Sequence, residues 1–397
     1  MTDVEVRLGG LKVGTIHRYA ATGGERIAFR YASEWLGSEL AFAIDPELFL
    51  DARTTSPARG GLFGAFADSA PDRWGRRLMQ RRERHLAEAA GRAVRSLSEL
   101  DYLLGVSDRA RQGALRFVVD GRYQAEGDEV PPLLKLGALL DAADRVARDE
   151  DTSEDLALLL APGSSLGGAR PKASVLDSNG ELAIAKFPRQ DDEYSVERWE
   201  WITLELARRA GIRVPDARLM RVGNRDVLVS RRFDRLGSER VHFASALTLL
   251  GLKDGDQASY PEIVEILQRE GSRPKQDAEE VFRRMVFNIC AANLDDHLRN
   301  HGFLRESSGW TLSPAYDLNP VPAEQRPRVL TTNITLDDAT GSLDVAREAA
   351  SYFGLGWAQV ERIVGEVSSA IGQWANVARG AGAPRAECER MRSAFLT

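Results

Sequence analysis

The first part of the sequence alternates apolar and polar residues with the period of β-strands. This alternation runs over 4–8, resumes after Gly9-Gly10 and returns over 27–31. Two glycines between alternating runs predict a β-hairpin, so we expect several antiparallel strands here. After Pro71 the apolar residues take helical spacing, with arginines between them over 73–84. This arginine-rich face is typical of a solvated helix surface, or alternatively of a docking surface for an acidic partner or for phosphates.

The middle of the chain combines two predicted hairpins with one predicted helix. The strands are expected over 173–175 and 182–187, and then over 218–222 and 226–230, with turn residues inside each pair. An apolar stripe between the hairpins predicts a helix over 196–210. Upstream, the acidic and turn-prone stretch Arg148–Asp155 is a candidate domain boundary.

Helical patterns dominate from about residue 260 onward. Val281, Met285 and Ile289 form one stripe, and the apolar positions over 357–374 predict one long amphipathic helix. The N-terminal part is thus rich in strands, the middle combines strands with one helix, and the C-terminal part is helical. This order predicts a two-lobed α+β protein.

Composition excludes several classes of protein. Of 397 residues 43% are hydrophobic and 28% charged, which is typical of a globular protein and not of a disordered one. With 53 Lys+Arg against 59 Asp+Glu the net charge is −6, so we expect any nucleic-acid contact to be local or made through a partner. The chain has two cysteines and no CxxC, and no apolar run of about 18 residues. We therefore predict a cytoplasmic protein without membrane contact, disulfide framework or cysteine-rich zinc site.

Two clusters in the middle of the chain could bind a nucleotide. The segment Gly163–Lys172 is rich in glycine and carries Arg170 and Lys172, so its backbone and charges could cradle phosphates. It lacks the Gly-Lys-Ser/Thr ending of a Walker A loop, and a plain glycine-rich connector is equally consistent with it. Lys186 ends an alternating strand and could hold phosphates, with Glu200 favoured over Glu197 to orient it. An exposed strand lysine is the alternative.

Two further clusters could carry catalysis. Asn293–Asn300 places an acid, a histidine and an amide within a few residues of an apolar helix. An aspartate such as Asp295 can accept a hydroxyl proton, and an asparagine five residues later can bind Mg²⁺. Asp317 lies between apolar residues after a predicted strand, where a metal would explain its charge. For the Asn293–Asn300 cluster, the simpler interpretation is a helix cap followed by a polar loop.

Taken in order, these clusters resemble the HipA family of toxin serine/threonine kinases over nearly the whole chain. The carriers of the resemblance are Pro71–Arg76, Gln112–Arg116, Ser165–Lys172, Asp295–Asn300 and Tyr316-Asp317. The resemblance implies a protein-kinase-like fold in three parts: an additional β-rich N-terminal subdomain over 1–127, a kinase N-lobe with hinge over 128–235, and a helical C-lobe over 236–397. No single motif is specific, but the ordered set is.

The resemblance also implies a role for each motif. It assigns Asp295 as the general base, Asn300 and Asp317 as ligands of Mg²⁺, and Ser165 as the autophosphorylated serine, with Ser164 as the alternative. It implies that ATP is contacted by two groups of residues: Gly167, Gly168, Ala169, Arg170, Pro171, Lys172 and Lys186, and then Arg231, Arg232, Phe233, His297, Asn300 and Tyr316. The family often has an acidic residue where this chain has Arg231, which puts side-chain contacts at the hinge in question.

The resemblance further implies a protein substrate, with aminoacyl-tRNA synthetases as the suggested target class, and a small helix-turn-helix antitoxin similar to HipB that carries the DNA binding. Two other functions are weighed against this one. A catalytically idle co-repressor would have no need of Asp295, Asn300 and Asp317 together. A Mg²⁺-dependent phosphatase or nuclease would have no need of the glycine-rich loop and Lys186.

Overall fold

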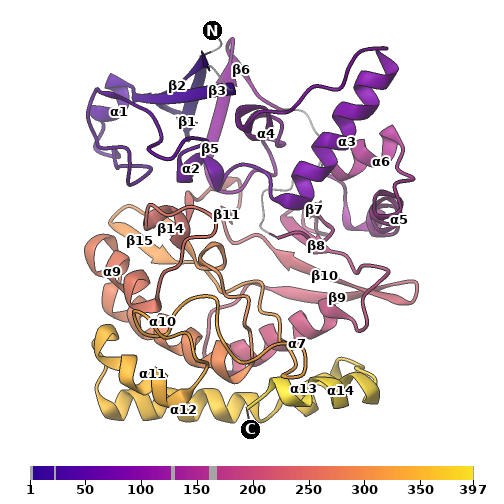
Figure 1. Ribbon diagram of the computed structural model, residues 1–397, viewed down its shortest axis with the longest axis vertical. Helices are drawn as coiled ribbons and strands as arrows, with labels where there is room; N and C mark the ends of the chain where they lie inside the picture. The colour runs from indigo at the N-terminus through magenta and orange to yellow at the C-terminus, as the bar shows by residue number, and fades with distance from the viewer. Residues whose placement is uncertain (1–2, 22–23, 127–129, 161–167, 397) are drawn as a thin grey trace. The chain divides into compact units, whose positions relative to one another are not determined.

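The chain is built from two units, each with its own strands and helices (Figure 1). The structure is a computed structural model that describes residues 3–21, 24–126, 130–160 and 168–396. The first unit comprises Met1–Gln190 and Asp234–Ala244, and the second comprises Asp191–Phe233 and Ser245–Thr397. The three-part division expected from the sequence stays a prediction.

A six-stranded antiparallel sheet in the order β4-β3-β2-β1-β5-β6 opens the first unit. Its strands are β1 (Val4–Leu8), β2 (Leu11–Ala21), β3 (Gly24–Tyr31), β4 (Thr54–Thr55), β5 (Leu115–Val119) and β6 (Arg122–Tyr123). The hairpin at Gly9-Gly10 is confirmed, because Leu8 pairs with Leu11. The short helices α1 (Ser33–Leu36) and α2 (Gly64–Ala67) contribute to the same core, in which Phe66 contacts Phe29 and Phe117 edge-on.

Helices α3 (Arg73–Ala89), α5 (Leu136–Ala147) and α6 (Ser153–Leu160) form a second part of this unit (Figure 1). The helix expected after Pro71 is confirmed as α3, but part of its arginine-rich face is internal. Arg81 pairs with Asp149 and Asp151, and Arg76 pairs with Glu99 of α4 (Glu99–Leu104) at 2.6 Å. These ion pairs join α3 to the acidic stretch 148–155, which therefore lies inside the first unit.

The first predicted hairpin of the middle region is confirmed as β7 (Lys172–Leu176) paired with β8 (Leu182–Lys186). A one-turn 3₁₀ helix (Leu133–Lys135) precedes α5, and the short strands β11 (Arg235–Leu236) and β12 (Glu239–Arg240) complete the unit. The β11 segment is hydrogen-bonded to the N-terminal part, because Gly113 N donates to Asp234 Oδ2 at 2.7 Å and Arg235 donates to Arg111 O at 2.6 Å.

The second unit contains the other hairpin and most of the helices. Its elements are α7 (Val196–Arg209), β9 (Ala217–Val222), β10 (Arg225–Arg231), α8 (Ala246–Leu249), α9 (Tyr260–Glu270), α10 (Pro274–Cys290), β14 (Gly302–Glu306), β15 (Gly309–Leu312), α11 (Leu343–Ala349), α12 (Trp357–Ile371), α13 (Trp374–Gly380) and α14 (Arg385–Met391), and β13 (Phe243–Ser245) precedes α8. The predicted hairpin and helix are confirmed as β9–β10 and α7. Helix α10 contacts both α9 and α12 (Figure 1).

The prediction of one long helix over 357–374 is wrong. Helix α12 ends at Ile371 with Gly372 as its cap, and α13 begins at Trp374. Glycine weakens a helix because it loses much backbone entropy when it is ordered. The interruption allows the Trp374 ring to stack on Phe395 with centroids 5.1 Å apart, a contact that the helical periodicity does not reveal.

The described residues include both cysteines and allow a search for membrane-spanning helices. Both cysteines are free thiols, and burial raises the pKa of Cys290 to about 11, so this thiol is a poor nucleophile. Within the described ranges, no helix combines the length and apolar character needed to cross a lipid bilayer.

One fully buried arginine holds the N-terminal part together. The Arg111 guanidinium donates to the carbonyl oxygens of Ser69 at 3.0 Å, Leu103 at 2.7 Å and Val106 at 2.8 Å. The Leu103 carbonyl lies in the last turn of α4, and the carbonyls of Ser69 and Val106 lie in turns outside the helices and strands. A planar group with five donors can serve several such acceptors at once.

We expect Arg111→Met to lower the free energy of unfolding by about 3–5 kcal/mol, because three buried carbonyls lose their donors. Chemical denaturation of purified protein would measure this change. Arg109→Met, which alters an exposed side chain two residues away, is the matched control and should change stability by about 0.5 kcal/mol or less. Equal stability of the two variants would contradict the structural role of Arg111.

Candidate active site

The described end of the glycine-rich loop is fixed by residues of the first unit. Ser165, the alternative Ser164, and Gly167 lie outside the described residues. Gly168 has φ +93°, a conformation that favours glycine, and Ala169 O accepts a hydrogen bond from Arg189 at 2.9 Å. Phe187 N donates to Pro171 O at 2.9 Å, which continues the β7–β8 pairing into the loop. The loop therefore enters β7 in a defined conformation.

Lys172 is buried and its charge is already paired. Its Nζ lies 2.7 Å from Asp72 Oδ2, while Asp72 Oδ1 caps helix α3 by accepting from Gly75 N at 2.8 Å. Trp74 Nε1 donates to Lys172 O at 3.0 Å. Burial raises the pKa of Asp72, opposed by the neighbouring ammonium of Lys172. In this structure Lys172 thus fastens the loop to α3, and its contact with phosphate stays a prediction.

Lys186 stands directly opposite Lys172 in the β7–β8 ladder. Like charges on facing strand positions repel, so pairing Lys172 with Asp72 removes one cause of strain beside Lys186. The expected orienting residue, Glu200, is buried on α7 in the second unit, as is its alternative Glu197. The pairing of Lys186 with Glu200 stays a prediction.

The predicted catalytic loop follows directly from α10. Ala292 adopts φ +47°, which ends the helical path and turns the chain into the segment 293–300. The side chain of Asp295 is exposed, and its main-chain O accepts a hydrogen bond from Asn300 Nδ2 at 2.9 Å. This bond leaves Asn300 Oδ1 as the atom that could coordinate a cation. His297 is half-buried, and its carbonyl accepts from Asn300 N at 2.7 Å.

The loop that carries Asp317 is hydrogen-bonded to the catalytic loop. Strands β14 and β15 form the hairpin expected between the two clusters. Tyr316 OH donates to Arg299 O at 2.6 Å, and Asn319 N donates to Asn293 Oδ1 at 2.9 Å. Asp317 has φ +58°, which is uncommon for a residue other than glycine and occurs often at functional sites. The structure therefore brings together the Asn293–Asn300 cluster and the cluster around Asp317.

The predicted hinge contributes one residue to the same place. The Phe233 ring lies against Tyr316 with centroids 5.5 Å apart and an interplanar angle of 30°. Arg231 ends β10, where its N donates to Asp216 O at 2.8 Å, and Arg232 is buried. The predicted hinge thus contacts the predicted metal-binding loop through the rings of Phe233 and Tyr316.

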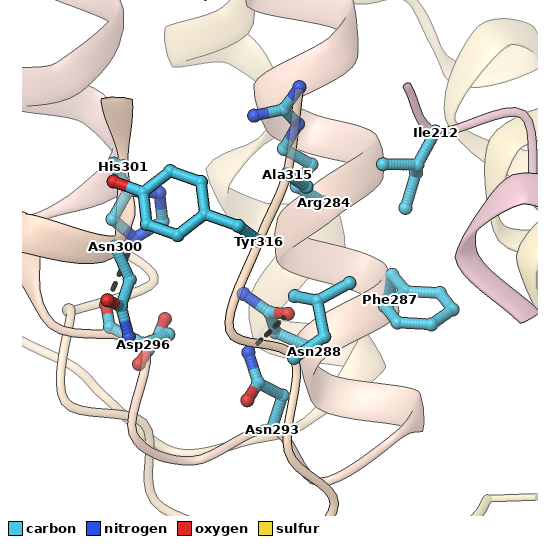
Figure 2. A pocket seen from close by; sticks show the side chains of 11 residues that line it. Ile212, Arg284, Phe287, Asn288, Asn293, Asp296, Asn300, His301, Ala315 and Tyr316 are labelled. Carbon is cyan, nitrogen blue, oxygen red and sulfur yellow. Dashed lines mark hydrogen bonds between the residues drawn. The ribbon is translucent and has the colours of Figure 1, made fainter. Parts of the chain in front are cut away.

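A hollow lies between α10 and these loops. Figure 2 shows Asn288 and Asn293 on one side and Asn300, His301 and Tyr316 on the other. Amide groups and apolar side chains both line the hollow. Such a mixture of an apolar surface with a few convergent polar groups is typical of binding sites.

Burial shifts the pKa of two groups beside this hollow. It raises the pKa of Asp296 to about 7, opposed by hydrogen bonds from Tyr260 and from the backbone N–H groups of Thr331 and Thr332. It lowers the pKa of His301 to about 4, opposed by a hydrogen bond with the Asp296 carbonyl. His301 therefore stays neutral near pH 7.

The residues at Asp317 fit a hard cation that also binds phosphate. Asp317 Oδ1 accepts from Asn319 Nδ2 at 3.1 Å, and the buried Asn319 Oδ1 has no hydrogen-bond partner. The described residues contain no group of three or more His, Cys, Asp or Glu side chains that could hold a metal by themselves. Mg²⁺ commonly takes one or two protein ligands and completes its shell with water and phosphate, so Asn300 and Asp317 suit it.

Several residues of this region were missed from the sequence. Asn293 and Asn319 lie inside the quoted clusters but have no assigned role, and Asp296 is adjacent to the expected base. Tyr260 and Asn288 lie on α9 and α10 and reach the catalytic loop only through tertiary packing. The motifs that contain or adjoin Asn293, Asn319 and Asp296 could have indicated these three residues. In the sequence, Tyr260 and Asn288 have the pattern of ordinary helix residues.

Two family models match this chain. Residues 4–130 match the HipA N-terminal domain and residues 164–375 match the HipA-like C-terminal domain. The serine/threonine-protein kinase toxin HipA of Shewanella oneidensis is 24% identical over 348 residues, which cover 79% of this chain and 74% of that protein. Y4mE of Sinorhizobium fredii, named as a candidate kinase, is 25% identical over 240 residues, and the match spans 52% of this chain and about half, 56%, of that protein.

The fold is that of a solved HipA structure. Shewanella oneidensis HipA, in its complex with HipB and operator DNA, matches with a TM-score of 0.69 and 19% identity, covering 94% of this chain and 90% of that one. The α+β, kinase-like fold with an additional β-rich N-terminal subdomain is therefore confirmed. Together the fold and the two family matches define a kinase-like protein. The chain belongs to the HipA family.

We expect Asp72→Ala to lower the free energy of unfolding by about 3–5 kcal/mol, because it removes a helix cap and the carboxylate that neutralises a buried lysine. Equilibrium denaturation measures this loss. Asp141→Ala, at an exposed position of α5, is the control. The double variant Asp72→Asn with Lys172→Met should recover most of the stability, and a loss equal to that of Asp72→Ala would contradict a charge-based origin.

Proposed function

We propose that this chain is an ATP- and Mg²⁺-dependent protein serine/threonine kinase that acts as a HipA-like toxin. The observation that carries the proposal is the hydrogen-bonded junction between the Asp295–Asn300 loop and the Tyr316–Asn319 loop. Phosphoryl transfer needs a base near the accepting hydroxyl and a cation beside the phosphates, and both sets of candidate side chains lie on this junction.

In this proposal each side chain has a distinct task. Asp295 is exposed and accepts the proton of a substrate serine or threonine hydroxyl. Asn300 and Asp317 hold Mg²⁺, and Lys186 with the described end of the glycine-rich loop holds the phosphates. Phe233 and Tyr316 supply apolar ring surface for the nucleotide. Bound MgATP would supply the γ-phosphoryl group and the cation that offsets its charge.

We further propose a protein partner that binds DNA for this chain. Its relative from Shewanella oneidensis was solved as a complex with HipB and operator DNA. A net charge of −6 disfavours a broad direct contact between this chain and the DNA phosphates. A small helix-turn-helix antitoxin similar to HipB would supply that contact, and a cytoplasmic protein such as an aminoacyl-tRNA synthetase would be the substrate.

Asp295→Asn keeps the size of the side chain and removes its basicity, so we expect phosphoryl transfer to fall by about 10²–10⁴-fold while ATP still binds. Transfer from labelled ATP to proteins of a lysate, together with calorimetric ATP binding, measures both quantities. Asp337→Asn changes an exposed aspartate of the same unit and serves as the control. Transfer that is unchanged in Asp295→Asn would remove Asp295 from its proposed role.

The same incubation tests autophosphorylation. We propose that wild type modifies Ser165, with Ser164 as the neighbouring alternative, and that Asp295→Asn does not. A phosphate adds about −1.5 to −2 charges in the loop proposed to hold ATP, so modified protein should bind ATP more weakly. Mass spectrometry locates the phosphate. Phosphate at Ser165 that leaves ATP affinity unchanged would contradict this regulation.

Lys186→Ala should weaken ATP binding by about 10- to 100-fold, which corresponds to about 1.5–3 kcal/mol for a charged hydrogen bond, and should leave adenosine binding nearly unchanged. The lost contact is to phosphate, which adenosine lacks. Calorimetry with both ligands makes the comparison, with the exposed Lys135→Ala as control. Equal losses for ATP and adenosine would show that Lys186 does not contact phosphate.

A further inference from the structure

Two adjacent carboxylates on the catalytic loop have opposite environments. Asp295 is exposed, whereas Asp296 is 1% exposed. Asp296 Oδ2 accepts from Tyr260 OH at 2.6 Å, and its Oδ1 accepts from Thr331 N at 2.8 Å and Thr332 N at 3.2 Å. The Asp296 side chain therefore ties the catalytic loop to α9 and to the segment 331–332, and it is too enclosed to meet a substrate.

The hydrogen bonds at Asp296 continue as a buried chain toward Asp317. Asn288 Nδ2 donates to Tyr260 OH at 2.9 Å, and Asn293 Nδ2 donates to Asn288 Oδ1 at 3.0 Å, a bond drawn in Figure 2. Asn319 N then donates to Asn293 Oδ1 at 2.9 Å. Asn319 Nδ2 donates in turn to Asp317 Oδ1 at 3.1 Å, so one connected network reaches both loops of the candidate site.

The donor-to-acceptor direction of this chain of hydrogen bonds is determined by the groups at its two ends. Asn319 N is a backbone donor, so Asn293 must present its oxygen there and its NH₂ to Asn288. Asn288 in turn presents its oxygen to Asn293 and its NH₂ to Tyr260, whose hydroxyl hydrogen is left for Asp296. From Asn319 N to Tyr260 OH, each donor thus points toward Asp296, whose ionised carboxylate can accept from all of its partners at once.

We propose that Asp296 is a positioning residue that, through Tyr260, Asn288 and Asn293, fixes the loop carrying Asp295 relative to the loop carrying Asp317. The kinetic part of this inference rests on the proposed function, and the structural part does not. The main chain of Asp296 reinforces the same arrangement, because its O accepts from Thr332 Oγ1 at 2.6 Å and from the His301 ring at 3.0 Å.

An asparagine at position 296 would not replace the carboxylate. Its oxygen would be required by the N–H groups of Thr331 and Thr332, so its NH₂ would face Tyr260 OH. The Tyr260 hydroxyl would then meet donors from both sides, and its own hydrogen would have no acceptor. Asp296→Asn therefore conflicts with the direction of the whole chain, although it keeps the size of the side chain.

Tyr260→Phe is the main test, because it removes one oxygen atom from the chain and touches neither loop's proposed ligands. We expect faster hydrogen exchange in peptides covering 293–301 and also in peptides covering 315–321, which contain no substitution. We also expect kcat/KM for MgATP to fall by about tenfold, with a higher Mg²⁺ concentration needed for half-maximal rate. Asp296→Asn should reproduce both changes.

Tyr31→Phe is the matched control. Tyr31 is a buried tyrosine of the first unit whose hydroxyl donates to Leu48 O at 3.2 Å and accepts from Ile44 N at 3.0 Å. We expect it to lower the unfolding temperature as Tyr260→Phe does, without changing exchange over 293–321 or the Mg²⁺ dependence. A Mg²⁺ dependence that shifts equally in both variants would show a general loss of stability and would overturn the inference.

The outcomes separate this inference from the proposed function. Wild type that transfers no phosphate overturns the proposed function, and hydrogen exchange alone then decides the inference. Exchange in Tyr260→Phe that rises over 293–301 while 315–321 stays protected would show that the chain does not couple the loops. Wild-type exchange and kinetics in Asp296→Asn would show that the direction of the chain has no effect. Either result overturns the inference.

Discussion

The second unit depends on the hydrogen bonds that hold the segment 291–300, the candidate catalytic loop, most of which has no regular secondary structure. After α10 ends, the segment 291–297 belongs to neither a helix nor a strand. A buried loop of this kind is stable only if side chains take up the hydrogen bonds that a helix or sheet would otherwise provide. Asp296 meets this requirement with three accepted hydrogen bonds at its carboxylate and two at its carbonyl. The Asp296 carboxylate thus holds the loop in place, while the side chain of the adjacent Asp295 is exposed.

In the first unit a buried ion pair between Asp72 and Lys172 likewise holds a loop in place. Asp72 caps α3 with one carboxylate oxygen and holds Lys172 with the other. The same helix start contributes Trp74, whose ring N–H donates to the Lys172 carbonyl. A buried charge pair is costly to form and very costly to break, so it specifies one arrangement of the glycine-rich loop's exit more than it adds stability. The Pro71–Arg76 motif thus acquires a physical role beside the proposed phosphate loop.

Each unit also holds charged side chains in a fixed arrangement. Two lysines face each other at the end of the β7–β8 hairpin, and one of them is neutralised by Asp72. On the other unit, the candidate metal loop carries Asp317 in a left-handed conformation, held by Asn319 and by the Tyr316–Arg299 hydrogen bond. Polar groups that are already held in position before a ligand binds cost less free energy to order on binding.

The sequence by itself determined the hairpins at Gly9-Gly10 and in the middle of the chain, helices α3, α7 and α10, and the order of the four polar clusters, because strand alternation, helical spacing and turn residues are local signals. It also carried the HipA resemblance, since that rests on short motifs in order. Tertiary structure alone decided that Asp296 and not Asp295 is buried, that Lys172 pairs with Asp72 a hundred residues away, and that Tyr260 and Asn288 reach the catalytic loop. Burial and long-range hydrogen bonds depend on which distant segments pack together, and no local pattern of residues records that packing.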